Sequence, residues 1–225
     1  KTLAKGLGVL ETLARDEQPM AVSEVARACG LTRSNAHRVL ATLAELGYVE
    51  QQPTSRRYAL TLKLWSMGAS LIARLDIKQV AAPFLRELNE ATGETTHLSV
   101  RDGHEIMYLD KLEARHAVRT FTRVGAKAPA FCVATGKAML AFQDDAVIEQ
   151  ACDTAVRFTA RTITDPVALR EELHRTRERG YAVNHGEWRG GAFGLAVPIR
   201  DAEGRVDAAI GISAPGDRLP DSRID

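Results

Sequence analysis

Residues 31–50, LTRSNAHRVLATLAELGYVE, decide the fold of the N-terminal part of the chain. Apolar residues recur through this stretch at the spacing of an amphipathic helix: Ala36, Val39, Leu40, Leu43 and Leu46. Thr32 stands where a helix needs a capping oxygen, and Gly47 stands where helices commonly end. The stretch therefore predicts a helix with one side toward a core and a polar, basic side opposite.

Two shorter helices precede this one, and a hairpin follows it. Apolar spacing predicts a helix from Leu3 to Arg15, and Ser23 can cap a second helix that ends at Gly30. The runs YVEQ and RYAL are strand-like, and the QPTSR between them has a proline and a serine that suit a turn. Three helices and a hairpin predict a compact module over residues 1–60.

This order of elements is typical of DNA-binding modules in which the third helix enters the major groove and a hairpin wing contacts the backbone. The predicted DNA-binding residues can all donate hydrogen bonds: Thr32, Arg33, Ser34, Asn35, His37 and Arg38 on the helix, with Arg56 and Arg57 in the wing. The alternative is a small helical domain with a solvated polar face. The net charge of +1 does not separate the two, whereas the wing arginines favour DNA.

Cysteine usage and hydropathy indicate the cellular compartment in which the protein works. Cys29, Cys132 and Cys152 form no CxxC pair and are odd in number, which argues against a disulfide framework and favours a reducing compartment. No apolar run approaches ~18 residues, and no basic-then-apolar signal segment opens the sequence. We therefore expect a cytoplasmic protein without membrane association.

The rest of the chain predicts a helical linker and then an α+β domain. Residues 61–92 have helical spacing, with interruptions expected near Asp76 and at Pro83. The apolar side chains early in this stretch are too many for a solvated linker and favour burial against a partner or a second chain. From residue 95 the period changes to two. The predicted strands and helices beyond it comprise a hairpin at Asp102-Gly103, a strand over 117–123, helices over 131–142, 145–153 and 165–180, a strand over 181–188 and a hairpin turning at 201–204.

Motifs along nearly the whole chain resemble those of the IclR family of bacterial transcriptional regulators. They are, in order, KGLGVLETLA, LTRSNAHRVLATLAELGYVEQ, RRYALTLKLWSMG, GKAMLA, GYAVNHGEW, GGAFGLAVPIRD and AAIGISAP. The resemblance implies a winged helix-turn-helix domain at 1–60, a linker helix at 61–78 and a GAF-like α+β effector domain at 79–225. It also implies a homodimer or tetramer that binds double-stranded operator DNA and responds to a small-molecule effector.

The resemblance further implies that a small organic acid lies between the segment near residue 131 and the last hairpin. Pro129 before a helical run predicts a helix N-terminus near Phe131, Cys132 and Val133, whose free N–H groups favour a carboxylate. The expected effector-binding residues are Ala128, Phe131, Cys132, Val133, Asn184, Trp188, Gly194, Gly211 and Ser213.

The size of the effector is a second expectation from these residues. Several relatives carry an acidic residue where Asn184 stands, a cysteine at Gly194 and a serine at Gly211. The missing side chains leave room, so we expect an acid larger than two carbons, such as an aromatic or branched carboxylate. Strand glycines also mark close backbone packing, which is the alternative.

Two rival functions remain open from the residues alone. Cys132 is a candidate nucleophile with His97, His104 or His185 as its base, which would make the chain a thiol-dependent enzyme. The N-terminal module could instead bind a protein partner as an adaptor. Gly136-Lys137 does not belong to a phosphate loop. That motif needs a glycine five residues before Gly136 and a Ser or Thr after Lys137, and these positions hold Phe131 and Ala138. The histidines lack metal-ligand spacing, so we expect no metal site. Neither rival explains the wing arginines together with the full-length resemblance, so we expect a regulator rather than an enzyme, without a cofactor.

Overall fold

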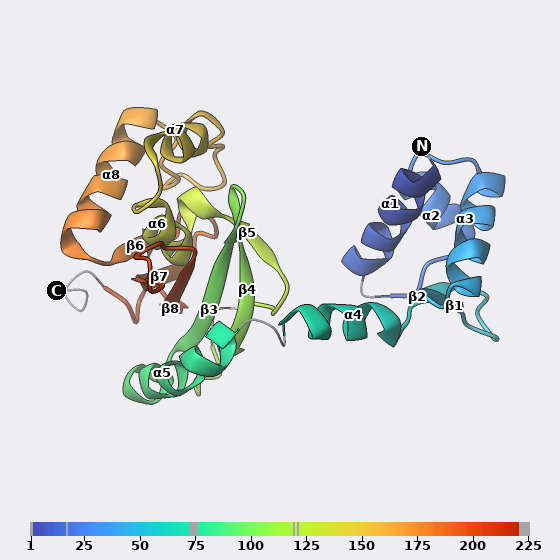
Figure 1. Cartoon of the computed structure of the whole chain (residues 1–225), viewed down its shortest axis with the longest axis horizontal. Helices are drawn as coiled ribbons and strands as arrows, with labels where there is room; N and C mark the ends of the chain where they lie inside the picture. Colours follow the sequence, from blue (N-terminus) through green and yellow to red (C-terminus); the bar gives the residue numbers. More distant parts are fainter. Residues whose placement is uncertain (1, 17, 73–75, 119, 121, 221–225) are drawn as a thin grey trace. The chain divides into compact units, whose positions relative to one another are not determined.

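The computed structural model describes residues 2–16, 18–72, 76–118, 120 and 122–220. The chain divides into two compact units, residues 1–75 and 76–225, each with its own core (Figure 1). The helix expected as a linker at 61–78 is thereby divided between the two units. Its first part belongs to the N-terminal unit, and Asp76 begins the first helix of the C-terminal unit.

The N-terminal unit has three helices, a two-stranded sheet and a fourth helix. Its elements are α1 (Thr2–Arg15), α2 (Val22–Ala28), α3 (Arg33–Glu45), β1 (Val49–Gln51), β2 (Tyr58–Leu60) and α4 (Leu62–Ile72). The strands pair antiparallel, with Val49 opposite Leu60. The predicted helices and hairpin are therefore confirmed in type and order.

The ends of the helices follow from local hydrogen bonds. The hydroxyl of Thr32 accepts a bond from the backbone N–H of Asn35 at 3.3 Å, so the predicted cap of α3 is confirmed. The predicted cap at Ser23 is wrong. The helix begins two residues earlier, at Val22, and the Glu24 carboxylate accepts the N–H of the capping residue Ala21 at 2.8 Å.

The core of the N-terminal unit forms where the apolar faces of its helices meet the hairpin. Its fully or nearly fully buried side chains are Val9, Leu13, Met20, Val25, Leu40, Leu43, Val49 and Tyr58. Since Ala36, Leu40 and Leu43 are the buried residues of α3, helical geometry directs the polar residues of its N-terminal half outward. The exposed N-terminal half of α3 is thus a consequence of where its leucines pack.

The C-terminal unit is built on one antiparallel sheet of six strands in the order β5-β4-β3-β8-β7-β6. The strands are β3 (Thr95–Asp102), β4 (Glu105–Leu112), β5 (Lys127–Pro129), β6 (Ala182–His185), β7 (Ala192–Ile199) and β8 (Ala208–Pro215). The hairpin predicted at Asp102-Gly103 is confirmed, and Gly103 adopts a left-handed φ of 64°. The strand predicted over 117–123 is wrong, because the described residues of that stretch run as a loop and β5 begins only at Lys127.

Helices cover both faces of this sheet (Figure 1). They are α5 (Asp76–Thr92) on one face, with η1 (Ala130–Cys132), α6 (Ala134–Leu140), α7 (Asp145–Asp153) and α8 (Pro166–Arg179) on the other. The interruption predicted at Pro83 is wrong, since α5 continues through it. Ala81 and Leu85 pack against Leu98 of the sheet, and this burial outweighs the lost backbone hydrogen bond. No helix among the described residues is long and apolar enough to cross a membrane.

Candidate functional site

The first candidate site is the exposed N-terminal half of α3. Thr32, Arg33, Ser34, His37 and Arg38 are all exposed, and Asn35 is half-buried. The guanidinium of Arg38 donates to the Asn35 side chain at 3.2 Å, which holds both side chains on one surface. Hydrogen-bond donors grouped at the start of a helix suit the major groove of DNA.

The two arginines of the β1–β2 turn differ in their surroundings. Arg57 forms a two-pronged ion pair with Glu24 of α2, at 2.9 and 3.1 Å, and donates to the carbonyl of Pro19 at 2.8 Å. These contacts tie the hairpin to α2, so the Arg57 side chain has a structural task. Arg56 is exposed at the tip of the turn, with a positive φ of 56°. Both were predicted to contact DNA, and the structure leaves Arg56 as the wing cation directed to solvent.

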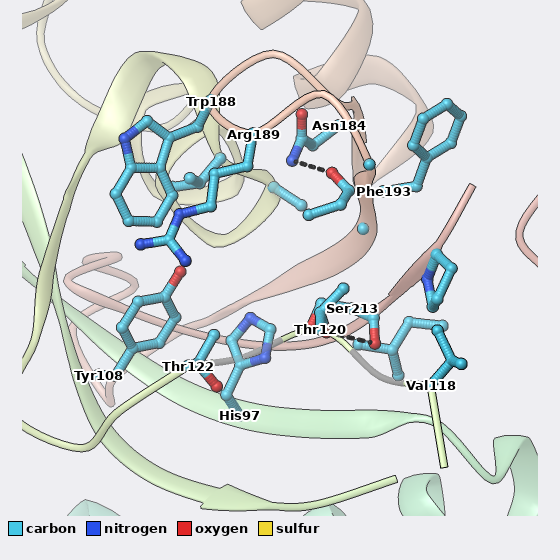
Figure 2. A pocket seen from close by; sticks show the side chains of 17 residues that line it. His97, Tyr108, Val118, Thr120, Thr122, Asn184, Trp188, Arg189, Phe193 and Ser213 are labelled. Atoms are coloured by element: carbon cyan, nitrogen blue, oxygen red, sulfur yellow. Dashed lines mark hydrogen bonds between the residues drawn. The ribbon is translucent and has the colours of Figure 1, made fainter. Parts of the chain in front are cut away.

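The second candidate site is a cavity of about 340 Å³ in the C-terminal unit (Figure 2). Its floor is one face of the sheet, where Asn184 pairs with Gly194 and Gly194 pairs with Ser213 across adjacent strands. The loop after β4 adds Val118, Thr120 and Thr122, and the loop after β6 adds Trp188 and Arg189. This volume lies at the small end of the range for ligand pockets, ~300–1,000 Å³.

The charge in this cavity has one sign. Arg189 is the one lining residue with a permanent charge among those the structure describes, and none of these residues is an acid. Its guanidinium lies 4.4 Å from the centre of the Trp188 ring, which holds the cation flat against an aromatic face. Figure 2 shows Arg189 and the Tyr108 phenol facing the same space. Burial raises the pKa of Tyr108 to about 12, so this phenol stays neutral.

The other polar lining groups are neutral. His97 lies on β3 with its ring edge toward Tyr108, and burial lowers the pKa of His97 to about 4. The hydroxyls of Thr120 and Ser213 bond each other at 2.6 Å. The Asn184 amide donates to the Ala192 carbonyl at 3.3 Å and accepts from a backbone N–H of the Trp188 loop at 2.9 Å. A single cation among neutral hydrogen-bonding groups suits a ligand with one carboxylate.

A buried ion pair fixes the loop that carries Trp188 and Arg189. Lys137 of α6 is 1% exposed, and its Nζ lies 2.6 Å from Oε1 of Glu187 and 3.6 Å from Oε1 of Glu172. Burial alone would raise the pKa of Glu172, but Lys137 and two arginines hold the pKa of that carboxyl below its usual range. The Gly136-Lys137 pair, which matches no phosphate loop, thus has a structural explanation: it anchors the residue next to Trp188.

The structure brings together five of the nine expected effector-binding residues in the cavity lining: Val133, Asn184, Trp188, Gly194 and Ser213. Ala128, Phe131 and Cys132 instead pack in the core behind it. The helix predicted over 131–142 is divided, because Val133 adopts an extended conformation between η1 and α6. The predicted helix N-terminus therefore lies at Val133 and Ala134, and both residues line the cavity. The α6 helix has only seven residues, and Arg189 is the charged side chain among the described lining residues.

The room expected at the two strand glycines also differs from the observed packing. A Cβ at Gly211 would lie 2.5 Å from the Leu195 carbonyl and 2.8 Å from the Ala196 Cβ. Gly211 is therefore required by close packing and does not line the cavity. Gly194 does line it, although a Cβ there would lie 3.0 Å from the carbonyl of Ile212. Of these two glycines, only Gly194 borders the cavity.

Cys132 has surroundings that oppose nucleophilic chemistry. It is fully buried, its thiol contacts the Pro129 carbonyl at 3.6 Å, and burial raises the pKa of the thiol to about 12. A reactive cysteine needs a lowered pKa and access, so this thiol suits packing. No three His, Cys, Asp or Glu side chains of the described residues gather closely enough to hold a metal ion.

Sequence reasoning missed five polar residues among the described lining of the cavity: His97, Tyr108, Thr120, Thr122 and Arg189. His97 pairs directly with Gly211 across β3 and β8, a register that no local pattern fixes. Arg189 lies in the loop between β6 and β7, next to the quoted GYAVNHGEW motif. A charged residue between that tryptophan and two glycines was the available signal.

Comparison with known proteins identifies the family. The model for "Bacterial transcriptional regulator IclR C-terminal" matches residues 69–225, and the model for "IclR helix-turn-helix domain" matches residues 2–53. This chain belongs to the IclR family. It is a DNA-binding transcriptional regulator whose helix-turn-helix and α+β domains have the architecture of solved IclR structures.

Relatives of this IclR-family chain match it along nearly its whole length. The regulator KdgR of Escherichia coli is 34% identical over 99% of this chain and 85% of its own, and XynR of the same organism is 31% identical over 100% and 90%. A solved IclR homolog from Microbacterium hydrocarbonoxydans, complexed with 4-hydroxybenzoate, is 32% identical, covers 96% of this chain and 89% of its own, and has a TM-score of 0.85. The relatives named here are regulators, which agrees with the absence of an activated thiol at Cys132.

Proposed function

We propose that this regulator binds operator DNA through the start of α3 and the Arg56 turn, and that its cavity senses an aromatic carboxylate. The observation that carries the ligand assignment is the charge of the cavity: Arg189 faces it, and the described lining residues include no acid. An arginine pairs with both oxygens of a carboxylate, which favours an acid over a neutral or cationic ligand.

The aromatic part of the assignment rests on the apolar walls. Trp188, Phe193 and Tyr108 line the same cavity, and flat rings pack well against such side chains. The solved homolog that holds 4-hydroxybenzoate supports this class of ligand for a chain of similar sequence and fold. An aromatic acid also agrees with the expectation of a ligand larger than two carbons.

We further propose that the protein acts as a homodimer formed through its N-terminal unit, with pairs of dimers as the larger assembly. Large apolar side chains are exposed on α1 and α4: Leu3 77%, Leu7 51%, Leu62 81%, Trp65 72% and Met67 54%. Patches of this kind on a folded unit are typical of protein interfaces. A symmetric dimer would present two α3 helices to half-sites about one helical turn, ~34 Å, apart.

Effector binding would change DNA affinity by shifting the dimer between two arrangements. The change equals the difference in effector affinity for the two arrangements, and DNA must change effector affinity by the same factor. The α4 helix, which follows the wing, is our candidate for the coupling element. Residues 73–75, which complete the expected coupling stretch 61–75, lie outside the described residues. As a bacterial DNA-binding regulator, the protein would act in the cytoplasm.

Calorimetric titration of the full chain with benzoate tests the ligand assignment. Replacing Arg189 with glutamine should weaken benzoate binding at least about tenfold, because an arginine–carboxylate pair in a cavity is worth ~1.5–3 kcal/mol. Arg200→Gln is the matched control, since Arg200 is exposed and lies against Phe142 outside the cavity. Equal affinity of the two variants would reject Arg189 as the carboxylate partner.

Fluorescence anisotropy with promoter DNA from beside the gene tests the DNA-binding face. Arg38→Ala should cost ~1–3 kcal/mol and relax specificity if Arg38 contacts a base, or weaken all sequences equally if it contacts only phosphate. Arg86→Ala, on the exposed side of α5 in the other unit, is the control. An Arg38 variant that binds DNA like the Arg86 variant would place the contact surface elsewhere.

A further inference from the structure

We propose that His97 and Thr122 form a second polar subsite in the cavity, which binds a hydroxyl group on the ring of the effector. The inference rests on the proposed function, since it assumes that an aromatic carboxylate occupies the cavity. It adds a specificity rule: the protein selects hydroxylated aromatic acids over the same acids without the hydroxyl.

The first observation is an unpaired buried atom on His97. This side chain is 5% exposed, and its Nδ1 finds no hydrogen-bond partner among the described residues. Leaving a buried nitrogen unpaired is costly, so native structures rarely do so without a reason. His97 also lines the cavity, and Figure 2 shows its ring standing up from β3 into that space. A ligand group is therefore positioned to complete its hydrogen bonds.

The second observation is a hydroxyl next to it. The Oγ1 atom of Thr122 is buried and likewise finds no partner among the described residues. Lys111 donates to the Thr122 carbonyl at 2.6 Å, which holds the backbone at Thr122. Figure 2 shows Thr122 beside His97 on the same side of the cavity. The hydroxyl of Thr120, by contrast, already bonds Ser213.

The chemistry of the two groups points to a hydroxyl. A neutral imidazole has one donor and one acceptor nitrogen, and a threonine hydroxyl both donates and accepts. Together they can satisfy a group that also donates and accepts. Burial keeps His97 uncharged at neutral pH, so it offers no charge to a second carboxylate. The cavity thus has one cationic position, at Arg189, and one neutral hydrogen-bonding position.

The test compares four ligands by calorimetry with the full chain: benzoate and its 2-, 3- and 4-hydroxy derivatives. At least one hydroxybenzoate should bind about tenfold more tightly than benzoate, because the hydroxyl pairs two buried groups that benzoate leaves unsatisfied. The preferred isomer reports where the subsite lies relative to Arg189.

Variants separate this subsite from a general effect of polarity. Thr122→Val and His97→Phe should each bring the ratio of hydroxybenzoate affinity to benzoate affinity to within about twofold of one. Thr122→Ser, which keeps the hydroxyl, should retain the wild-type ratio. Thr154→Val is the control, because Thr154 is exposed at the end of α7 and its hydroxyl bonds Gln150. Circular dichroism establishes that each variant is folded.

Each outcome decides between the two proposals. A preference that Thr122→Val abolishes and Thr122→Ser retains supports the subsite. Benzoate binding with no preference among the four acids, or a preference that survives Thr122→Val, overturns the subsite but leaves the carboxylate sensor standing. If none of the four acids binds, the proposed ligand class is wrong, and the subsite falls with it.

Discussion

Removing the buried cation Lys137 should destabilise the C-terminal unit more than removing any surface lysine. Lys137→Met leaves the Glu187 carboxylate, whose side chain is 5% exposed, without the amine 2.6 Å away. Its second oxygen, Oε2, already finds no partner among the described residues. Glu172 keeps Arg175 and Arg179 at 3.0 and 2.9 Å, so the variant orphans one carboxylate rather than two.

The expected cost is about 3–5 kcal/mol, the range for removing one partner of a buried ion pair. The matched control is Lys127→Met. Lys127 also lies 2.6 Å from a carboxylate, that of Asp102, but its side chain is 41% exposed. A solvated pair of the same length contributes less than about 1 kcal/mol. Burial, and not the distance, is therefore the variable that this comparison isolates.

Urea denaturation followed by tryptophan fluorescence measures both variants. In a Trp65→Phe background Trp188 is the single tryptophan, and it reports on the C-terminal unit alone. The double variant Lys137→Met with Glu187→Gln should recover much of the loss, since the unpaired charge is gone. If Lys137→Met costs no more than Lys127→Met, the buried pair does not hold the Trp188 loop as described.

Three further predictions concern other parts of the molecule. The pKa of His97 is about 4 in the folded chain against 6.5 in an ordinary histidine, so the unfolded chain binds more protons between these pH values. Lowering the pH from about 6.5 to 4 should therefore reduce the free energy of unfolding by about 3 kcal/mol. Chemical denaturation of His97→Phe should lack this pH-dependent loss. Arg57→Ala should lower the melting temperature of the N-terminal unit, because Arg57 pairs with Glu24. Arg56→Gln should leave the melting temperature unchanged and reduce the salt slope of DNA binding by ~1. The reverse pattern would make Arg56 the structural arginine and Arg57 the DNA contact. Gly136→Ala should destabilise the chain by more than about 1 kcal/mol, because a Cβ there would collide with the backbone of Ala130, and an unchanged denaturation midpoint would show that the contact relaxes.

The sequence predicted those parts of the fold in which local chemistry decides the outcome. The α3 helix follows from its leucine spacing and the Thr32 cap, and both hairpins of the sheet follow from their turn residues. The polar face of α3 followed as well, because the positions of Leu40 and Leu43 determine which side chains point outward. These features depend on neighbours within a few residues.

The cavity depended on contacts between distant segments, which no local pattern records. Residues 117–123 alternate like a strand, yet Thr120 bonds Ser213 of β8 and the described part of the stretch lines the cavity. The continuous helix expected from Phe131 is divided at Val133. His97 and Arg189 line the same cavity only because β3 lies beside β8 in the sheet and the loop after β6 borders that cavity. Tertiary packing overrode local preference at each of these positions.

The measurement that tests the central claim most directly is DNA binding by anisotropy, with and without saturating aromatic acid, for the wild-type chain and Arg189→Gln. We predict that both proteins bind promoter DNA equally without acid, and that the acid shifts the affinity of the wild type by at least about fivefold while the variant does not respond. An equal shift in both proteins, or no shift by any acid that calorimetry shows to bind, would contradict the claim that the Arg189 cavity controls DNA binding.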